Sequence, residues 1–136
     1  MPKRILLCDD EIHILRAAEF KLKKAGYEVR IAGDGQEGWE AIEEELPDVL
    51  ITDCQMPRLD GVSLVTRVRQ DSRTEDLPVL MLTAKGFELS HDELAERLNI
   101  RKIVAKPFSP RALLHLVNEV LAEVEEKATS GAVEHS

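Results

Sequence analysis

Residues 49–61 read VLITDCQMPRLDG, in which a short apolar run ends at Asp53 and gives way to a turn that contains Pro57 and Gly61. A run of this length, rich in β-branched and aliphatic residues and bounded by turn residues, is typical of a buried β-strand. We therefore predict a strand over residues 49–52, with Asp53 at its carboxyl end.

Four similar apolar runs lie elsewhere in the chain, at residues 4–8, 28–32, 79–82 and 103–105. Segments with apolar residues at spacings of three and four separate them, which is the pattern of amphipathic helices. Apolar strands joined by helices indicate a parallel sheet covered on both faces, and right-handed connections then give a doubly wound α/β fold.

Several residues mark the ends and inner faces of the expected helices. The first helix should stop near Gly26, and the second should begin at Asp34 and end before Pro47. A capping box at Ser90 predicts the start of the fourth helix, and Ser109 with Pro110 predicts the start of the fifth. The residues expected to face inward on the first two helices are Ile12, Leu15, Ala18, Leu22, Trp39, Ile42 and Leu46.

The length and charge of the chain limit what it can be. With 136 residues it fits one domain, and a formal charge of −8 disfavours direct binding to nucleic acid or to an anionic membrane. It has no apolar run of the ~20 residues that cross a bilayer, so we expect a cytoplasmic protein. Cys8 and Cys54 fit neither a disulfide framework nor a metal-binding spacing. We expect a domain over residues 1–124 and a polar, flexible tail over residues 125–136.

Polar residues gather at the carboxyl ends of the predicted strands, where ligands bind in open α/β sheets. They are Asp9, Asp10, Asp53, Thr83 and Lys106. Taken singly, Asp9 or Asp10 could cap the next helix, Thr83 could be a turn residue, and Lys106 could be a solvated charge. Together, however, neighbouring carboxylates repel one another unless a proton or a cation offsets them, and Mg²⁺ favours carboxylate oxygens. A nucleophilic carboxylate, a cation and fixed donors are what phosphoryl transfer to an aspartate requires.

The motifs Asp9-Asp10-Glu11, residues 53–61 (DCQMPRLDG), Thr83-Ala84 and Lys106-Pro107-Phe108 resemble those of response-regulator receiver domains, in order and in spacing. The resemblance covers residues ~3 to ~124. It implies a flavodoxin-like, five-stranded parallel sheet with strand order 2-1-3-4-5, and a signalling domain rather than an enzyme, with at most self-phosphorylation and self-dephosphorylation.

The resemblance also implies a role for each matching residue. Asp53 would be the phosphorylated residue. Mg²⁺, or Mn²⁺, would bind Asp10, Asp53 and the main-chain carbonyl of Gln55, with Asp9 assisting directly or through water. Thr83 would hydrogen-bond the phosphoryl group and Lys106 would pair with it. The Lys106–Pro107 peptide bond would be cis, and Gln55 and Lys85 would tune dephosphorylation.

The family's partners are a sensor histidine kinase or histidine phosphotransfer protein on the input side and an effector or output domain on the other. The implied output surface is the face of the fourth helix, fifth strand and fifth helix, in a monomer or a phosphorylation-dependent dimer. Ile103 stands where the family usually has an aromatic switch residue. We hypothesise that Arg101 and Lys102 contribute to partner recognition. Whether the chain acts alone or belongs to a longer protein stays open.

Three other interpretations each fit part of the sequence. A phosphatase of the haloacid dehalogenase type needs a second carboxylate two residues after its nucleophile, where this chain has Gln55. A flavodoxin-like cofactor carrier needs a hydroxyl- and glycine-rich loop after the first strand, where this chain has Asp9-Asp10-Glu11. A degenerate receiver, acting as an interaction module without phosphorylation, is disfavoured by the complete acidic, threonine and lysine set.

Overall fold

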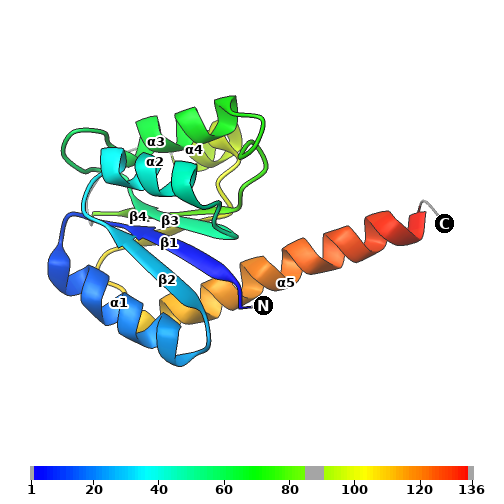
Figure 1. The fold of residues 1–136 in the computed structure, drawn as a ribbon, viewed down its shortest axis with the longest axis horizontal. Helices are drawn as coiled ribbons and strands as arrows, with labels where there is room; N and C mark the ends of the chain where they lie inside the picture. Colours follow the sequence, from blue (N-terminus) through cyan, green and yellow to red (C-terminus); the bar gives the residue numbers. More distant parts are fainter. Residues whose placement is uncertain (1, 85–90, 135–136) are drawn as a thin grey trace.

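The structure is a computed structural model that describes residues 2–84 and 91–134 (Figure 1). Its five strands form one parallel sheet in the order β2-β1-β3-β4-β5, which confirms the predicted fold class and strand order. The strands are β1 (Arg4–Cys8), β2 (Glu28–Ala32), β3 (Val49–Asp53), β4 (Val79–Thr83) and β5 (Lys102–Ala105). The helices are α1 (Ile12–Lys24), α2 (Gly35–Glu44), α3 (Gly61–Gln70), α4 (His91–Leu98) and α5 (Pro110–Glu134).

The helices cover both faces of the sheet, with α1 and α5 on one side and α2, α3 and α4 on the other (Figure 1). Successive side chains of a strand point to opposite faces. In β1, Ile5 and Leu7 therefore pack in the core under α1 and α5, whereas Leu6 and Cys8 pack in the core under the other three helices. Every residue of β3 and β4 is buried, which explains why these two central strands are apolar up to the polar residues at their carboxyl ends.

Parallel pairing brings the carboxyl ends of the strands to one edge of the sheet. Cys8 pairs with Thr52, Asp53 with Leu82, and Thr83 with Ala105. The strands β3 and β4 each run one residue further than predicted, to Asp53 and Thr83, and β5 begins one residue earlier, at Lys102. The polar residues that follow β1, end β3 and β4, and follow β5 therefore share this edge.

Local signals set the helix ends where predicted. Gly26 adopts a φ of +103° just after α1, a conformation that favours glycine. Asp34 caps α2 by accepting the N–H of Glu37 at 2.9 Å, and Ser109 caps α5 by accepting the N–H of Ala112 at 3.0 Å. The capping box predicted at Ser90 lies outside the described residues.

One expectation about the helices was wrong, and one helix is longer than expected. α5 continues through the polar segment from residue 125 to Glu134 and extends beyond the sheet (Figure 1), while the flexibility of that segment stays a prediction. Glu125, Glu126 and Lys127 are good helix formers, and extending a helix already anchored in the core costs little. Ile12 and Leu46, predicted to face inward, are 51% and 45% exposed because one lies in the first turn of its helix and the other follows the end of α2.

Candidate functional site

Asp9 is the buried member of the acidic run that follows β1. Its main-chain N–H donates to the carbonyl of Ala32 at 3.1 Å, and its Oδ1 accepts the N–H of Glu11 at 2.9 Å. The residue at the N-cap of α1 is Glu11, whose side chain makes no capping hydrogen bond. Asp9 and Asp10 are therefore not helix caps, and the alternative structural role considered for them is not seen.

Asp53 ends β3 and is 5% exposed. Its Oδ1 lies 3.4 Å from the main-chain N of Gln55, a long contact, and Gln55 itself is exposed. Gly61 packs against the main chain of Asp53, since a Cβ at position 61 would lie 1.9 Å from the carbonyl oxygen of Asp53. A glycine is thus needed for the chain to return so closely to Asp53.

Lys106 joins the two carboxylates from the other side of the edge. Its Nζ lies 2.9 Å from Oδ2 of Asp9, 2.9 Å from Oδ2 of Asp53 and 3.0 Å from Oε1 of Glu11. The peptide bond to Pro107 is cis, as the resemblance implied. The main-chain N–H of Lys106 donates to the carbonyl of Thr83 at 2.7 Å. The ammonium is therefore held at the centre of the acidic cluster.

The cluster shifts the pKa values of two of its members. Burial raises the pKa of Asp9 to about 6; the hydrogen bonds from the Glu11 N–H and Lys106 oppose this, and the charge of Asp53 adds to it. Burial alone would lower the pKa of Lys106, but its hydrogen bonds to Asp9, Asp53 and Glu11 outweigh burial and raise it. Lys106 is therefore charged over the whole physiological range.

Four carboxylates lie close enough to hold a cation. One oxygen from each of Asp9, Asp10, Glu11 and Asp53 falls within 4.8 Å of the others. The sequence predicted three of these residues as ligands together with the main-chain carbonyl of Gln55. Glu11 was not among the predicted ligands, and its position as the third acid in the run is the signal that could have included it.

Thr83 is 1% exposed, and its Oγ1 has no hydrogen-bond partner within residues 2–84 and 91–134. A buried hydroxyl without a partner is costly and uncommon, so this hydroxyl suits the binding of a group that brings a hydrogen-bond acceptor. An anion bound at Asp53 would supply an acceptor at this edge. The structure thus brings Asp9, Asp10, Asp53, Thr83 and Lys106 to one rim, as predicted.

Two further residues were predicted to act at this site. Lys85, expected to tune dephosphorylation, lies outside the described residues. Ile103 is partly buried, pairs with Met81 across the sheet and packs on the core under α2, α3 and α4. It is therefore placed as a packing residue beneath α4.

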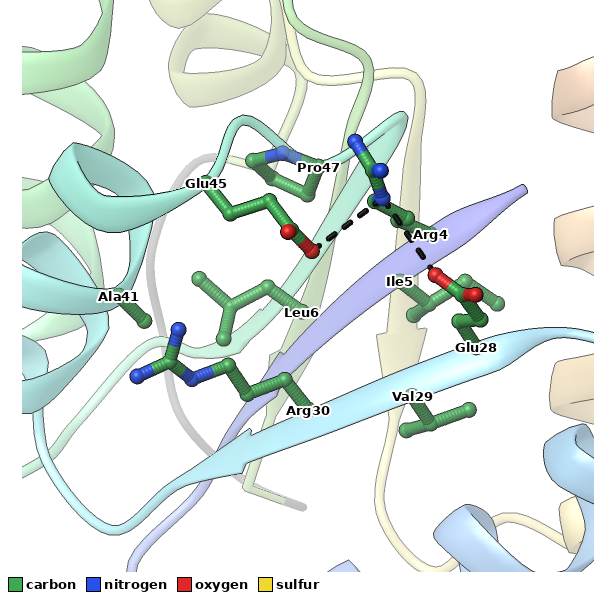
Figure 2. Close-up of a pocket in the computed structure, with 9 residues that line it drawn as sticks. All are labelled: Arg4, Ile5, Leu6, Glu28, Val29, Arg30, Ala41, Glu45 and Pro47. Carbon is green, nitrogen blue, oxygen red and sulfur yellow. Dashed lines mark hydrogen bonds and ion pairs between the residues drawn. The ribbon is translucent and has the colours of Figure 1, made fainter. Parts of the chain in front are cut away.

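A separate cavity of about 310 Å³ lies at the opposite end of the sheet (Figure 2). Arg4 lines it and pairs with Glu28 at 3.4 Å and with Glu45 at 3.2 Å. Arg4 and Glu28 begin β1 and β2, whereas Asp9 and Asp53 stand at the carboxyl ends of strands. The cavity therefore belongs to neither the acidic cluster nor its chemistry.

Comparison with known proteins identifies the family. The family model described as "Response regulator receiver domain" matches residues 5–118. This chain belongs to the response regulator receiver domain family.

Relatives of this receiver domain agree with that assignment. It is 36% identical over 135 residues to "Alkaline phosphatase synthesis transcriptional regulatory protein PhoP" of Bacillus subtilis (strain 168), covering 99% of this chain and 55% of that protein. The chain spans about half the length of the curated relatives it matches.

Solved structures also resemble this receiver domain. A putative response regulator from Chloroflexus aurantiacus J-10-fl matches with 40% identity and a TM-score of 0.81, over 90% of this chain and 99% of that one. Chemotaxis protein CheY4 of Vibrio cholerae matches with 31% identity and a TM-score of 0.81, over 88% and 99%. The chain is thus a receiver domain of a two-component response regulator.

Proposed function

We propose that this receiver domain accepts a phosphoryl group on Asp53, in a Mg²⁺-dependent reaction with the phosphohistidine of a sensor histidine kinase or a histidine phosphotransfer protein. The observation that carries the proposal is the position of Lys106, whose Nζ lies 2.9 Å from Oδ2 of both Asp9 and Asp53. Two buried carboxylates are thus held together by one cation, beside two further acids that could share a second cation.

The residues fit a divalent metal ion. Asp10, Asp53 and the main-chain carbonyl of Gln55 would hold it, with Asp9 assisting directly or through water and Glu11 close enough to contribute. A bound Mg²⁺ supplies charge neutralisation for the phosphoryl oxygens, and Mn²⁺ favours the same oxygen ligands.

In the proposed transfer, Asp53 is the nucleophile, and the metal ion, Lys106 and Thr83 stabilise the phosphoryl group. A carboxylate oxygen of Asp53 attacks the phosphorus atom, and the bond from phosphorus to the imidazole nitrogen of the donor breaks, so that the imidazole leaves with the bonding electron pair and takes up a proton. Lys106 would then pair with a phosphoryl oxygen, and the hydroxyl of Thr83 would donate to another.

Phosphorylation would change the surface that β4, β5 and their helices form. A dianionic group at Asp53 would give Thr83 and Lys106 a new acceptor at the ends of β4 and β5. Arg101, which precedes β5, pairs with Glu123 of α5 at 3.7 Å. A shift of β5 would therefore reach α5, and we propose the α4–β5–α5 face as the output surface for an effector or output domain.

We further propose that the chain turns over no external substrate. The position two residues after Asp53 carries Gln55, an amide that lacks the second carboxylate of an aspartate-dependent phosphatase. Hydrolysis of the phosphoryl group would then be slow and tuned by Gln55 and Lys85.

None of the helices described here is both long and apolar enough to span a membrane.

The test is the intact mass of the protein after incubation with acetyl phosphate, a small phosphoryl donor that needs no kinase. The wild type should gain one phosphoryl group with Mg²⁺ present and none with a chelator. Asp53→Asn, which keeps the size of the side chain, should gain none in either case. An equal gain in Asp53→Asn would place the acceptor on another residue.

A further inference from the structure

The loop between β3 and α3, residues 54–60, is tied to the start of α2 by an ion pair. Nε and Nη2 of Arg58 lie 2.9 Å and 2.8 Å from Oδ2 of Asp34. The other oxygen of the same carboxylate, Oδ1, caps α2 by accepting the N–H of Glu37 at 2.9 Å. Asp34 is buried, so one shielded carboxylate serves the helix and the loop at once.

Main-chain contact at the next residue reinforces this ion pair. A Cβ at Gly35 would lie 1.9 Å from the carbonyl oxygen of Leu59. The chain at positions 34–35 therefore touches the chain at positions 58–59 directly, and only glycine at position 35 allows the approach. The loop is held against α2 along two consecutive residues.

Arg58 stands in a backbone conformation that its residue type does not favour. Arg58 has a φ of +67°, a left-handed conformation that costs a side-chain-bearing residue about 1 kcal/mol and favours glycine or asparagine. The other non-glycine residue with positive φ in the described chain is Asn99, a residue type that tolerates it. At position 58 an unfavourable residue type is present, and its guanidinium is engaged.

The ion pair links the two parts of the proposed metal site. The carbonyl of Ala32, two residues before Asp34, accepts the N–H of Asp9 at 3.1 Å, so the start of α2 is fixed to the strand end that carries the acidic run. On the other side, Arg58 belongs to the same short loop as Gln55. The ion pair therefore runs from the segment fixed beside the acidic run to the loop that carries the Gln55 carbonyl.

We propose that the ion pair between Arg58 and Asp34 positions the metal-binding loop, so that the main-chain carbonyl of Gln55 stays within reach of a cation held by Asp10 and Asp53. This inference rests on the proposed function, and it makes Arg58 a positioning residue that contacts neither metal nor phosphoryl group. Burial would raise the pKa of Asp34, but hydrogen bonds from the Glu37 N–H and from Arg58 outweigh it and hold the pKa below its usual range. The pair is therefore charged wherever a carboxylate site binds Mg²⁺.

Simple electrostatics and positioning predict opposite effects when the guanidinium is removed. Arg58 is a cation near a cation site, so its loss should tighten Mg²⁺ binding slightly if charge alone matters. If Arg58 positions the loop, its loss should weaken Mg²⁺ binding, since partners that orient metal ligands typically contribute about 10-fold in affinity.

The experiment measures Mg²⁺ affinity by isothermal titration calorimetry, and amide hydrogen exchange of residues 54–61 in the metal-free protein. Arg58→Asn removes the guanidinium while suiting the left-handed backbone, and Arg58→Lys keeps the charge with fewer donors. Arg73→Met is the matched control, because Arg73 pairs with Asp71 at 2.8 Å in the loop before β4 and its loss changes the net charge equally.

Arg58→Asn should bind Mg²⁺ about 10-fold more weakly than the wild type. It should also exchange the amides of residues 54–61 faster without metal, and Arg58→Lys should lie between the two. Arg73→Met should match the wild type in both measurements. Equal affinity in Arg58→Asn and wild type, or equal weakening in Arg73→Met, would overturn the inference and leave the proposed function standing. No Mg²⁺ binding by the wild type would overturn the proposed function itself.

Discussion

At the scale of single residues, the hydroxyl of Thr83 is the group that links the fold most directly to the proposed phosphorylation. Thr83 is buried, and its Oγ1 finds no acceptor or donor in the part of the chain that the structure describes. Such a group costs about 1–3 kcal/mol in the folded protein. That cost would be offset when a phosphoryl oxygen arrives to accept the hydroxyl proton.

We therefore expect Thr83→Val to separate stability from phosphorylation. Valine has the same shape and suits a buried strand, so the unphosphorylated variant should be as stable as the wild type or about 1 kcal/mol more stable in urea unfolding. Its rate of phosphorylation by acetyl phosphate should fall about 10-fold, because one donor to the phosphoryl group is lost.

Thr83→Ser is the control, since it keeps the hydroxyl and should keep most of the rate. A Thr83→Val protein that is phosphorylated as fast as the wild type would show that the hydroxyl does not assist phosphoryl transfer.

Residue types at strand ends were enough to predict most of the site. Asp9, Asp53 and Lys106 each follow or end an apolar run, and parallel strands bring such ends together whatever the details of packing. The contact of Lys106 with Glu11 and the ion pair of Arg58 with Asp34 could not be predicted, because both join loops whose paths the strand pattern does not determine.

At the scale of elements, Arg69 near the end of α3 fastens three segments together. Its guanidinium donates to the main-chain carbonyls of Glu75, Leu77, Leu98 and Asn99 at 2.7–3.1 Å. It thus donates to the last carbonyl of α4, that of Leu98, to the carbonyl of Asn99 that follows the helix, and to the turn before β4. This one side chain ties the C-terminal end of α4 to α3.

Replacing Arg69 by methionine keeps the apolar stem and removes these hydrogen bonds. We expect Arg69→Met to lose about 3 kcal/mol of unfolding free energy in urea, since several partly buried carbonyls would be left without a donor. Arg67→Met, two residues away, removes a guanidinium whose carbon lies 5.4 Å from the ring centre of Trp39, its one contact of this kind among the described residues, and should cost less than about 1 kcal/mol. Equal losses in the two variants would mean that the carbonyl contacts contribute little.

The sequence predicted the strands well because β3 and β4 are buried on both faces. Such strands are short runs of apolar residues, which stand out in the sequence. Helix ends were less certain. Polar composition after Val124 predicted a polar, flexible tail and gave no sign of a helix, yet Glu, Lys and Ala are helix formers in their own right, and α5 continues through them. Composition signals the absence of a core contact more reliably than the absence of a helix.

At the scale of the whole molecule, the metal-free domain carries four acids within 4.8 Å of one another and a formal charge of −8. Burial raises the pKa of Asp9 from 3.8 to about 6. The folded state therefore binds a proton there more tightly than the unfolded state, so this group's contribution to stability falls as pH rises from about 4 to about 6. Bound Mg²⁺ would replace that proton above pH 6.

We accordingly expect Mg²⁺ to raise the melting temperature clearly at pH 7.5 and only slightly at pH 5. At pH 5 a proton is bound to Asp9 in most molecules, and this proton competes with the metal. Differential scanning fluorimetry with and without Mg²⁺ at the two pH values measures this. Asp9→Asn should remove most of the pH dependence of the Mg²⁺ effect. A Mg²⁺-induced shift of the same size at both pH values would contradict a role for Asp9 in the metal site.

The central claim, that Asp53 carries the phosphoryl group, is tested most directly by locating it chemically. An acyl phosphate is reduced by borohydride, which converts the modified aspartate to homoserine, and peptide mass spectrometry then identifies the residue. After incubation with acetyl phosphate and Mg²⁺, homoserine should be found at position 53 and at no other aspartate, and omission of Mg²⁺ should abolish it. Homoserine at another position with residue 53 unchanged would contradict the account.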